Sequence, residues 1–266
     1  MPYLTTPSGS RIFYKRIGQG PPLLLIMGTG LDHAVWNQQV NSYCNEFECI
    51  VFDNPGVGES RRAPKSSPLT IASIAENVVE LLEHLNLEPV HVSGLSLGSC
   101  VAQELVLARP DLVKTLQLHG TWARADGYVR RKFQAQISLL RRLDLRAFYE
   151  INVLWFITPR YFRQYPDVVE SQINTIVSGA DKCALIQQYE ADIDHDTLSR
   201  LHRVTVPTLV TVGSYDVAIP PLYSREVAEA IDGAEFVIFE EGGHLHNVEN
   251  PEQFNRVTLD FLLRHR

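Results

Sequence analysis

Short runs of apolar residues recur along the chain and alternate with longer segments in which apolar residues keep a helical spacing. Residues 23–27 are apolar on both faces, a pattern typical of a central parallel strand that helices cover on each side. Residues 11–17 alternate between apolar and polar side chains, which predicts an edge strand of antiparallel type. Further strands with apolar character are predicted at 49–52, 90–93, 113–118, 208–212 and 236–239.

Helical patterns separate these strands. Thr70 is a candidate N-cap for a helix whose apolar residues, from Ile71 to Leu85, fall on one stripe. The last helix opens with Asn250, Pro251 and Gln253, in the positions of an N-cap, a first-turn proline and a capping-box glutamine. Strands and helices that alternate in this way predict an α/β fold with a mostly parallel central sheet and helices on both faces.

One region interrupts the alternation. Residues 122–200 are helical in pattern and rich in aromatic side chains, and they lie between the predicted strands at 113–118 and 208–212. We predict that 122–200 form a helical cap inserted into a core made of 1–121 and 201–266. Ligands bind at the carboxyl edge of the sheet in open α/β folds, so the cap is expected to cover that edge.

Composition narrows the classes of partner and compartment. The net charge is −7, and no run of lysines or arginines indicates a site for nucleic acid or a membrane surface. Residues 1–20 lack the pattern of a signal peptide, and no apolar stretch approaches the roughly 18 residues that cross a bilayer. The four cysteines are scattered, which favours free thiols over disulfides or a metal site. We predict a cytoplasmic protein without metal, as a monomer or a homodimer.

The most informative segment is Gly94-Leu95-Ser96-Leu97-Gly98, between the predicted strand at 90–93 and a helical pattern at 97–109. A serine flanked two residues away on each side by glycine, between a strand and a helix, is typical of a nucleophile elbow. Side chains at 94 or 98 are expected to collide with neighbouring backbone. Ser96 is therefore the candidate nucleophile, and an ordinary tight turn is the alternative that the flanking pattern argues against.

A serine hydroxyl needs an adjacent base, which an acid holds in orientation. In folds with this elbow the order along the chain is serine, acid, histidine. His244 follows the last predicted strand in a glycine-rich loop and is the predicted base, with His246 as its main competitor. Asp216 lies just past the strand at 208–212 and is the predicted acid. The rival acids lie in the predicted cap: Asp192, Asp194 and Asp196.

A transition state with a developing oxyanion also needs hydrogen-bond donors. We predict the backbone N–H of Leu97, directly after the nucleophile, and that of Thr29, in the glycine-rich loop after the strand at 23–27. The cap aromatics predict a mainly apolar small-molecule substrate. The predicted substrate-contacting residues are Gly28, His119, Trp122 and Trp155.

The loop at 53–60 contains Gly-Val-Gly but lacks the third glycine and the downstream acid of a dinucleotide fingerprint. We therefore predict a structural loop there rather than a phosphate site.

With these residues placed, the chain resembles the α/β-hydrolase family over nearly its whole length. Within that family it is most similar to small capped hydrolases that include 3-oxoadipate enol-lactonase and related carboxylesterases. The likeness is carried by 94–98, 53–60, 206–216 and Gly243-His244, which stand in the order typical of the family. The resemblance implies a triad of Ser96, His244 and Asp216, an oxyanion hole at Thr29 and Leu97, and no cofactor.

One departure is Met27, which stands where the family usually has a histidine before the glycine. The floor of the pocket is expected to be more apolar as a result, with the loop held in another way. The Gly-Thr-Gly loop at 28–30, followed by Asp-His and a tryptophan, is similar to loops of hydrolases in polyketide pathways.

The leading hypothesis is a serine hydrolase that cleaves a carboxylic ester or lactone through an acyl-enzyme. A C–C bond hydrolase or lyase with the same triad is the alternative, with a tailoring role in a polyketide-type pathway. A ligand receptor of the same fold is a third hypothesis, which very slow turnover would distinguish.

Overall fold

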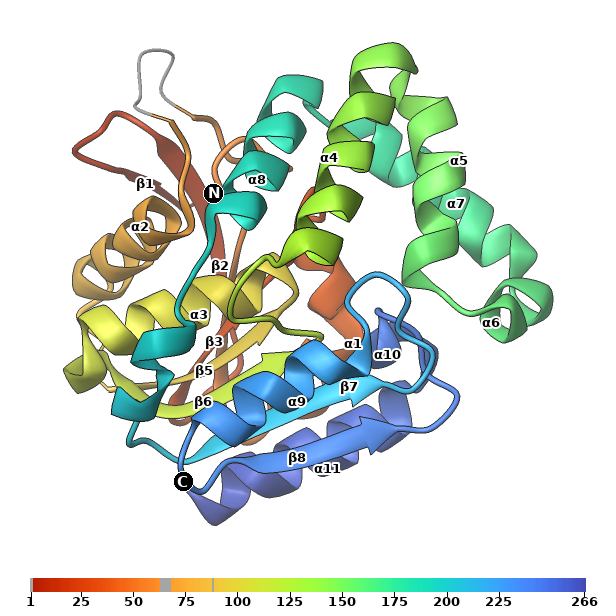
Figure 1. Cartoon of the computed structure of the whole chain (residues 1–266). Helices are drawn as coiled ribbons and strands as arrows, with labels where there is room; N and C mark the ends of the chain where they lie inside the picture. Colours follow the sequence, from red (N-terminus) through yellow and green to blue (C-terminus); the bar gives the residue numbers. More distant parts are fainter. Residues whose placement is uncertain (1, 63–67, 88) are drawn as a thin grey trace.

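The computed structural model describes residues 2–62, 68–87 and 89–266 (Figure 1). Eight strands form one sheet in the order β1-β2-β4-β3-β5-β6-β7-β8. The strands are β1 (Tyr3–Thr5), β2 (Arg11–Ile17), β3 (Pro22–Ile26), β4 (Glu48–Phe52), β5 (Val90–Leu95), β6 (Val113–His119), β7 (Thr208–Gly213) and β8 (Glu235–Phe239). The predicted mostly parallel sheet is confirmed.

Strand direction changes only at one end of the sheet. β2 pairs antiparallel with both β1 and β4, whereas the pairs from β4 to β8 are all parallel. The antiparallel direction predicted for 11–17 is confirmed, but its edge position is wrong, because β1 lies outside it. β1 has three residues, too few for an alternating pattern to be recognised in the sequence.

Helices cover both faces of the sheet (Figure 1). α2, α3 and α9 contribute to one buried apolar cluster, and α1 and α11 contribute to another. Their bounds are α1 (Asn37–Tyr43), α2 (Ile71–His84), α3 (Leu97–Ala108), α9 (Pro221–Ala230), α10 (His246–Glu249) and α11 (Pro251–Arg264). Short 3-10 helices lie at His33–Trp36, Pro110–Leu112 and Leu198–Arg203.

The helices α2 and α11 both begin where the sequence predicts, with Pro251 in the first turn of α11, but only one of them has its predicted cap. Thr70 caps α2 as predicted: its hydroxyl accepts from the Ser73 N–H, and the Ser73 hydroxyl accepts from the Thr70 N–H, each at 3.0 Å. The capping box predicted at Asn250 is wrong, because the Asn250 side chain makes no cap hydrogen bond. α10 ends directly before Asn250, which takes φ −131° and ψ 56° rather than the extended conformation of an N-cap.

Between β6 and β7 the chain forms helices that lie at one end of the sheet, along the top and the right side of Figure 1. We call this part the helical insertion: α4 (Gly127–Arg142), α5 (Leu145–Phe156), α6 (Pro159–Gln164), α7 (Pro166–Gly179) and α8 (Lys182–Asp194). It has an apolar core of its own, which includes Leu140, Phe148 and Ile173. The boundaries of the cap at 122 and 200, and of the core at 1–121 and 201–266, stay a prediction. Residues 1, 63–67 and 88 of that core lie outside the described residues.

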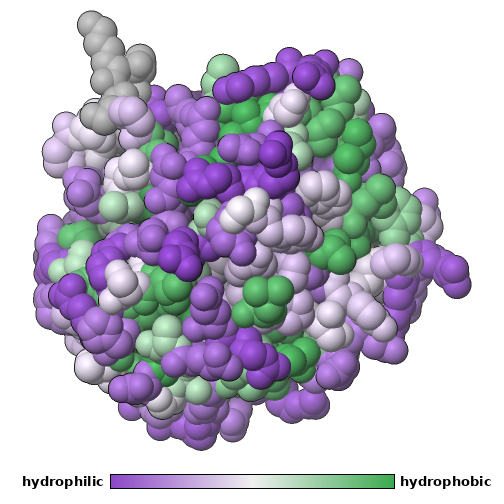
Figure 2. Space-filling view, in the orientation of Figure 1, coloured by the Kyte–Doolittle hydropathy of each residue, from purple (hydrophilic) through white to green (hydrophobic). Residues whose placement is uncertain are grey.

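Apolar residues gather on the outer surface over the region of α5 and α7 (Figure 2). Exposed there are Ile151, Leu154 and Val168. No helix within the described parts of the chain combines the length and the apolar character that crossing a membrane requires.

Candidate active site

Ser96 stands on a strained turn between β5 and α3. Its backbone has φ 55° and ψ −124°, in a region that residues other than glycine rarely adopt. A β-carbon at Gly94 would lie 2.6 Å from the Gly98 carbonyl carbon, and one at Gly98 would lie 2.7 Å from the Ile26 carbonyl carbon. Both glycines are therefore required by the close approach of α3 to β5 and β3, as the sequence predicts.

His244 and Asp216 form a buried pair. The loop after β8 carries His244 and the turn after β7 carries Asp216, with 2.7 Å between His244 Nδ1 and Asp216 Oδ2. A carboxylate oxygen only accepts, so Nδ1 donates and Nε2 is left as the acceptor of the neutral ring. Asp216 Oδ1 accepts from the Ile219 N–H at 2.8 Å, and the Phe156 ring stacks on His244 with centroids 5.4 Å apart. The imidazole is thus held from two sides.

The competing histidine is committed elsewhere. His246 Nε2 lies 2.8 Å from the Thr211 hydroxyl, and its Nδ1 lies 3.1 Å from the His244 carbonyl oxygen. Complete burial lowers the pKa of His246 to about 4. Both ring nitrogens have partners within the core, so His246 is a structural residue. Of the rival acids, Asp194 and Asp196 are exposed.

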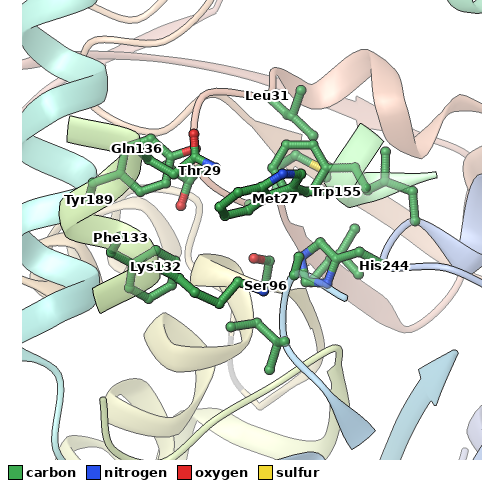
Figure 3. Close-up of a pocket in the computed structure, with 16 residues that line it drawn as sticks. Met27, Thr29, Leu31, Ser96, Lys132, Phe133, Gln136, Trp155, Tyr189 and His244 are labelled. Carbon is green, nitrogen blue, oxygen red and sulfur yellow. The ribbon is translucent and has the colours of Figure 1, made fainter. Parts of the chain in front are cut away.

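Ser96 and His244 line one pocket beneath the helical insertion (Figure 3). Two predicted substrate contacts, Gly28 and Trp155, also line it, and a β-carbon at Gly28 would lie 2.9 Å from Ser96 Cβ. Among the described residues, neither Ser96 Oγ nor His244 Nε2 has a hydrogen-bond partner. The distance between a nucleophile and its base is often long in the absence of substrate and shortens when substrate binds. Apolar side chains form most of the remaining lining: Met27, Leu31, Phe133, Phe156, Ala218 and Ile219.

The other two predicted substrate contacts are corrected by the structure. His119 is completely buried, with Nε2 at 2.9 Å from the Ser93 hydroxyl and Nδ1 at 2.7 Å from the Thr211 hydroxyl. Trp122 is also completely buried, and its ring packs 5.4 Å from that of Phe133. Neither residue lines the pocket, because both side chains are enclosed by the core.

The loop that follows β3 approaches Ser96 through Gly28, and hydrogen bonds to residues distant in the sequence hold it in place. Asn54 Nδ2 donates to the Met27 carbonyl at 2.8 Å. The Thr29 hydroxyl donates to Asp192 Oδ2 at 2.8 Å, and the Gly30 N–H donates to Gln188 Oε1 at 2.7 Å. Asp192 and Gln188 belong to α8, so the helical insertion itself holds this loop.

One of the two predicted oxyanion donors lines the pocket of Ser96, and the other directly follows Ser96 in the chain. Thr29 lines the pocket, and Leu97 opens α3, where the first N–H groups of a helix lack partners within the helix.

Asp192 is an unusual carboxyl group. It is completely buried, and its Oδ1 has no partner among the described residues. Burial raises the pKa of Asp192 to about 8, against the opposing effect of the Thr29 hydrogen bond. The carboxyl that supports the Thr29 loop is therefore largely protonated at neutral pH.

Hydrogen bonds to one buried carboxylate hold the loop at 53–60. The buried carboxylate of Asp53 accepts from the backbone and ring N–H groups of His33, each at 2.8 Å, and from the Glu59 N–H at 2.9 Å. Over the described residues, no group of three or more His, Cys, Asp or Glu side chains could hold a metal ion.

The sequence of this chain is similar to those of known hydrolases. A family model described as the alpha/beta hydrolase fold matches residues 21–153, half of the chain. The relative named "Putative carbamate hydrolase RutD" from Azorhizobium caulinodans is 28% identical over 251 residues, which cover 94% of each chain.

Two solved structures have the same fold along the whole chain. A thermophilic esterase from Thermogutta terrifontis has a TM-score of 0.90 at 27% identity, with 100% of this chain and 99% of that chain covered. The enol-lactonase from Burkholderia xenovorans has a TM-score of 0.89 at 26% identity, with coverage of 98% and 100%. These similarities support hydrolytic activity, and the chain belongs to the alpha/beta hydrolase family.

Proposed function

We propose that this protein hydrolyses a carboxylic ester or lactone, with Ser96 as nucleophile, His244 as base and Asp216 as the acid that orients it. The observation that carries the proposal is the meeting of three features at one pocket. These are a serine on a strained turn, a histidine whose Nδ1 is held by a buried carboxylate, and a glycine-rich loop against the serine. The family and its esterase and lactonase neighbours supply independent support.

In the proposed reaction, Ser96 Oγ attacks the carbonyl carbon while its proton passes to His244 Nε2. Asp216 stabilises the imidazolium that forms. The N–H groups of Thr29 and Leu97 bind the tetrahedral oxyanion, and each such donor contributes roughly 3–4 kcal/mol of transition-state stabilisation. His244 then protonates the leaving alcohol oxygen, and a water molecule activated by His244 releases the acid and restores Ser96.

The lining of the pocket supports a small substrate that is mainly apolar. Met27, Phe133, Trp155 and Phe156 offer aliphatic and aromatic surface around Ser96. The four free cysteines and the net charge of −7 support a cytoplasmic enzyme that acts on a small molecule rather than on nucleic acid. A monomer or homodimer and the absence of a cofactor belong to the same proposal.

The experiment that tests the proposal is a substrate panel at pH 7.5. It contains p-nitrophenyl acetate, butyrate and octanoate, a set of small lactones and a vinylogous diketone. We expect turnover of an ester or a lactone at roughly 1–1,000 s⁻¹. Cleavage of the diketone without any ester or lactone turnover would replace the proposal by a C–C hydrolase. A few cycles per hour on every compound would favour a receptor.

The ionisation of Asp192 is expected to make kcat depend on pH. Above about pH 8 its carboxyl group ionises, and a negative charge beside the Thr29 loop opposes an oxyanion held there. Two titratable neighbours, Cys100 and Tyr189, have pKa values that burial raises, so they stay neutral over this range. We expect wild-type kcat to fall about tenfold between pH 7.5 and 9.5, and Asp192→Asn to hold its rate, because its amide oxygen can still accept from Thr29.

The same group links pH to stability. Because the folded-state pKa of Asp192 is raised, its contribution is fully present below the unfolded pKa and is lost as the pH rises through about 8. The Tm of wild type is therefore expected to decline, relative to Asp192→Asn, as the pH rises from 4 to 9. Superimposable activity and Tm profiles for the two proteins would contradict this account of Asp192.

A further inference from the structure

The wall of the pocket formed by α4 carries two polar side chains beside the apolar Phe133. Lys132 and Gln136 are four residues apart on this helix, so they lie on the same face. Both line the pocket that contains Ser96 (Figure 3). The Lys132 side chain extends from α4 toward Ser96, with Gln136 farther along the same wall, on the side of Thr29.

Lys132 is a half-buried cation with spare donors. Its ammonium donates to the Val217 carbonyl oxygen, and it lies 4.9 Å from the ring centroid of Trp155 and 5.3 Å from that of Tyr128. An ammonium has three N–H donors, and among the described residues only one of them donates to an oxygen atom. Burial lowers the pKa of Lys132, while the nearby Asp216 opposes this effect. The Lys132 ammonium is thus held in the pocket with fewer hydrogen-bond acceptors than it has donors.

No carboxylate among the described residues forms an ion pair with Lys132. Asp216 is the acid whose charge acts on it, but both oxygens of Asp216 already accept hydrogen bonds, from His244 Nδ1 and from the Ile219 N–H. A cation in an apolar pocket is costly unless it is paired. A carboxylate on a molecule that enters the pocket would supply the ion-pair partner that Lys132 lacks among the described residues.

Gln136 gives a second, independent indication of a ligand. Its side chain is only 2% exposed, and Oε1 accepts from Asn152 Nδ2 at 2.9 Å. That bond places the Nε2 donor on the other side of the amide, and Nε2 has no partner among the described residues. A buried donor without a partner costs free energy until an acceptor arrives.

We propose that Lys132 and Gln136 form a carboxylate subsite, so that the substrate is an ester or lactone whose acyl part carries a carboxylate. This inference rests on the proposed function and names the substrate class of the same pocket. The carbonyl carbon lies at Ser96, the apolar lining surrounds the carbon chain, and the carboxylate accepts from Lys132 Nζ and Gln136 Nε2. Half-esters of dicarboxylic acids and lactones with a side-chain acid have this form.

The test compares charged and neutral esters of matched shape. The charged probes are the mono-p-nitrophenyl esters of glutaric, adipic and pimelic acid. Each is paired with the p-nitrophenyl ester in which an isopropyl group replaces the carboxylate. The ratio of kcat/KM for charged over neutral ester is measured at pH 7.5 in wild type, with the Ser96→Ala rate subtracted as background.

Four variants test which side chains determine the ratio of kcat/KM for charged over neutral ester. Lys132→Met removes the charge at similar length, Lys132→Arg keeps it, and Gln136→Leu removes the amide donor. Arg131→Met makes the same loss of charge at an exposed position on the same helix and is the matched control. Circular dichroism and Tm establish that each variant is folded.

We expect wild type to prefer one charged ester over its neutral partner by at least about tenfold. Lys132→Met is expected to lower the ratio about 10- to 100-fold and Gln136→Leu about 3- to 10-fold. Lys132→Arg retains most of the preference, and Arg131→Met retains all of it. A wild-type preference for the neutral esters, or a ratio that Lys132→Met leaves unchanged, would overturn the inference while neutral-ester turnover still supports the proposed function. Absence of turnover on both series, with no reaction of Ser96 with a fluorophosphonate, would overturn both.

Discussion

Ser96→Ala is expected to lower kcat for the best ester or lactone by about 10⁵- to 10⁶-fold, with substrate binding largely retained. The substitution removes only Oγ. Alanine keeps the β-carbon that packs against Gly28, and the backbone turn is still defined by the close contacts of Gly94 and Gly98. The loss therefore reports the chemistry of the hydroxyl rather than a change of fold.

The effect is measured by single-turnover and steady-state kinetics on purified protein. Ser178→Ala, at an exposed position on α7, is the matched control and is expected to keep the wild-type rate. Unchanged circular dichroism and Tm for Ser96→Ala establish that the protein is folded. A loss smaller than about tenfold would remove Ser96 from the reaction.

Asp216→Asn carries the second largest expected effect, a loss of about 10⁴-fold in kcat. The Ile219 N–H donates to Asp216 Oδ1, so the oxygen of the new amide must take that position. Its NH₂ group then faces His244 Nδ1, where the carboxylate oxygen now accepts at 2.7 Å. The imidazole is forced into the tautomer with the proton on Nε2, which cannot accept the proton of Ser96.

The matched control is Asp194→Asn, which makes the same change at an exposed position of α8 and is expected to be silent. Proton NMR of the histidine ring tests the cause directly, because the variant should show the proton on Nε2 instead of Nδ1. A fully active Asp216→Asn protein would show that another group orients His244, and the assignment of the acid would fail.

Much of the site could be predicted because its determinants are local. Ser96 is marked by glycines at two-residue spacing between a strand and a helix, and those glycines meet backbone in the folded protein. Asp216 and His244 each follow a strand, and parallel strands end at one edge of a sheet, so their side chains meet although 28 residues separate them.

The burial of His119 and Trp122 could not be predicted from their positions in the sequence. Position at the end of a strand gives the edge of the sheet, but it does not tell whether a side chain enters the pocket or the core. His119 turns to the Ser93 and Thr211 hydroxyls, which come from the neighbouring strands β5 and β7. Those partners become neighbours only through the order of strands in the sheet.

The contributions of the helical insertion could not be predicted from the sequence. Asp192 reaches Thr29 across 163 residues, and Gln188 reaches Gly30 across 158. From the sequence, Asp192 is a candidate only as a rival acid, and neither Gln188 nor Gln136 belongs to a recognisable motif. How α4 and α8 pack over the sheet decides which of their side chains face the pocket, and this packing depends on apolar contacts spread over the whole insertion.

The most direct test of the central claim is to label the protein with a fluorophosphonate at pH 7.5 and map the adduct by tandem mass spectrometry. We predict one adduct per chain, located on Ser96, formed at a rate that Asp216→Asn lowers strongly and that Ser178→Ala leaves unchanged. Labelling at another residue, or steady ester turnover by a protein whose Ser96 remains unmodified, would contradict the assignment of Ser96 as the nucleophile.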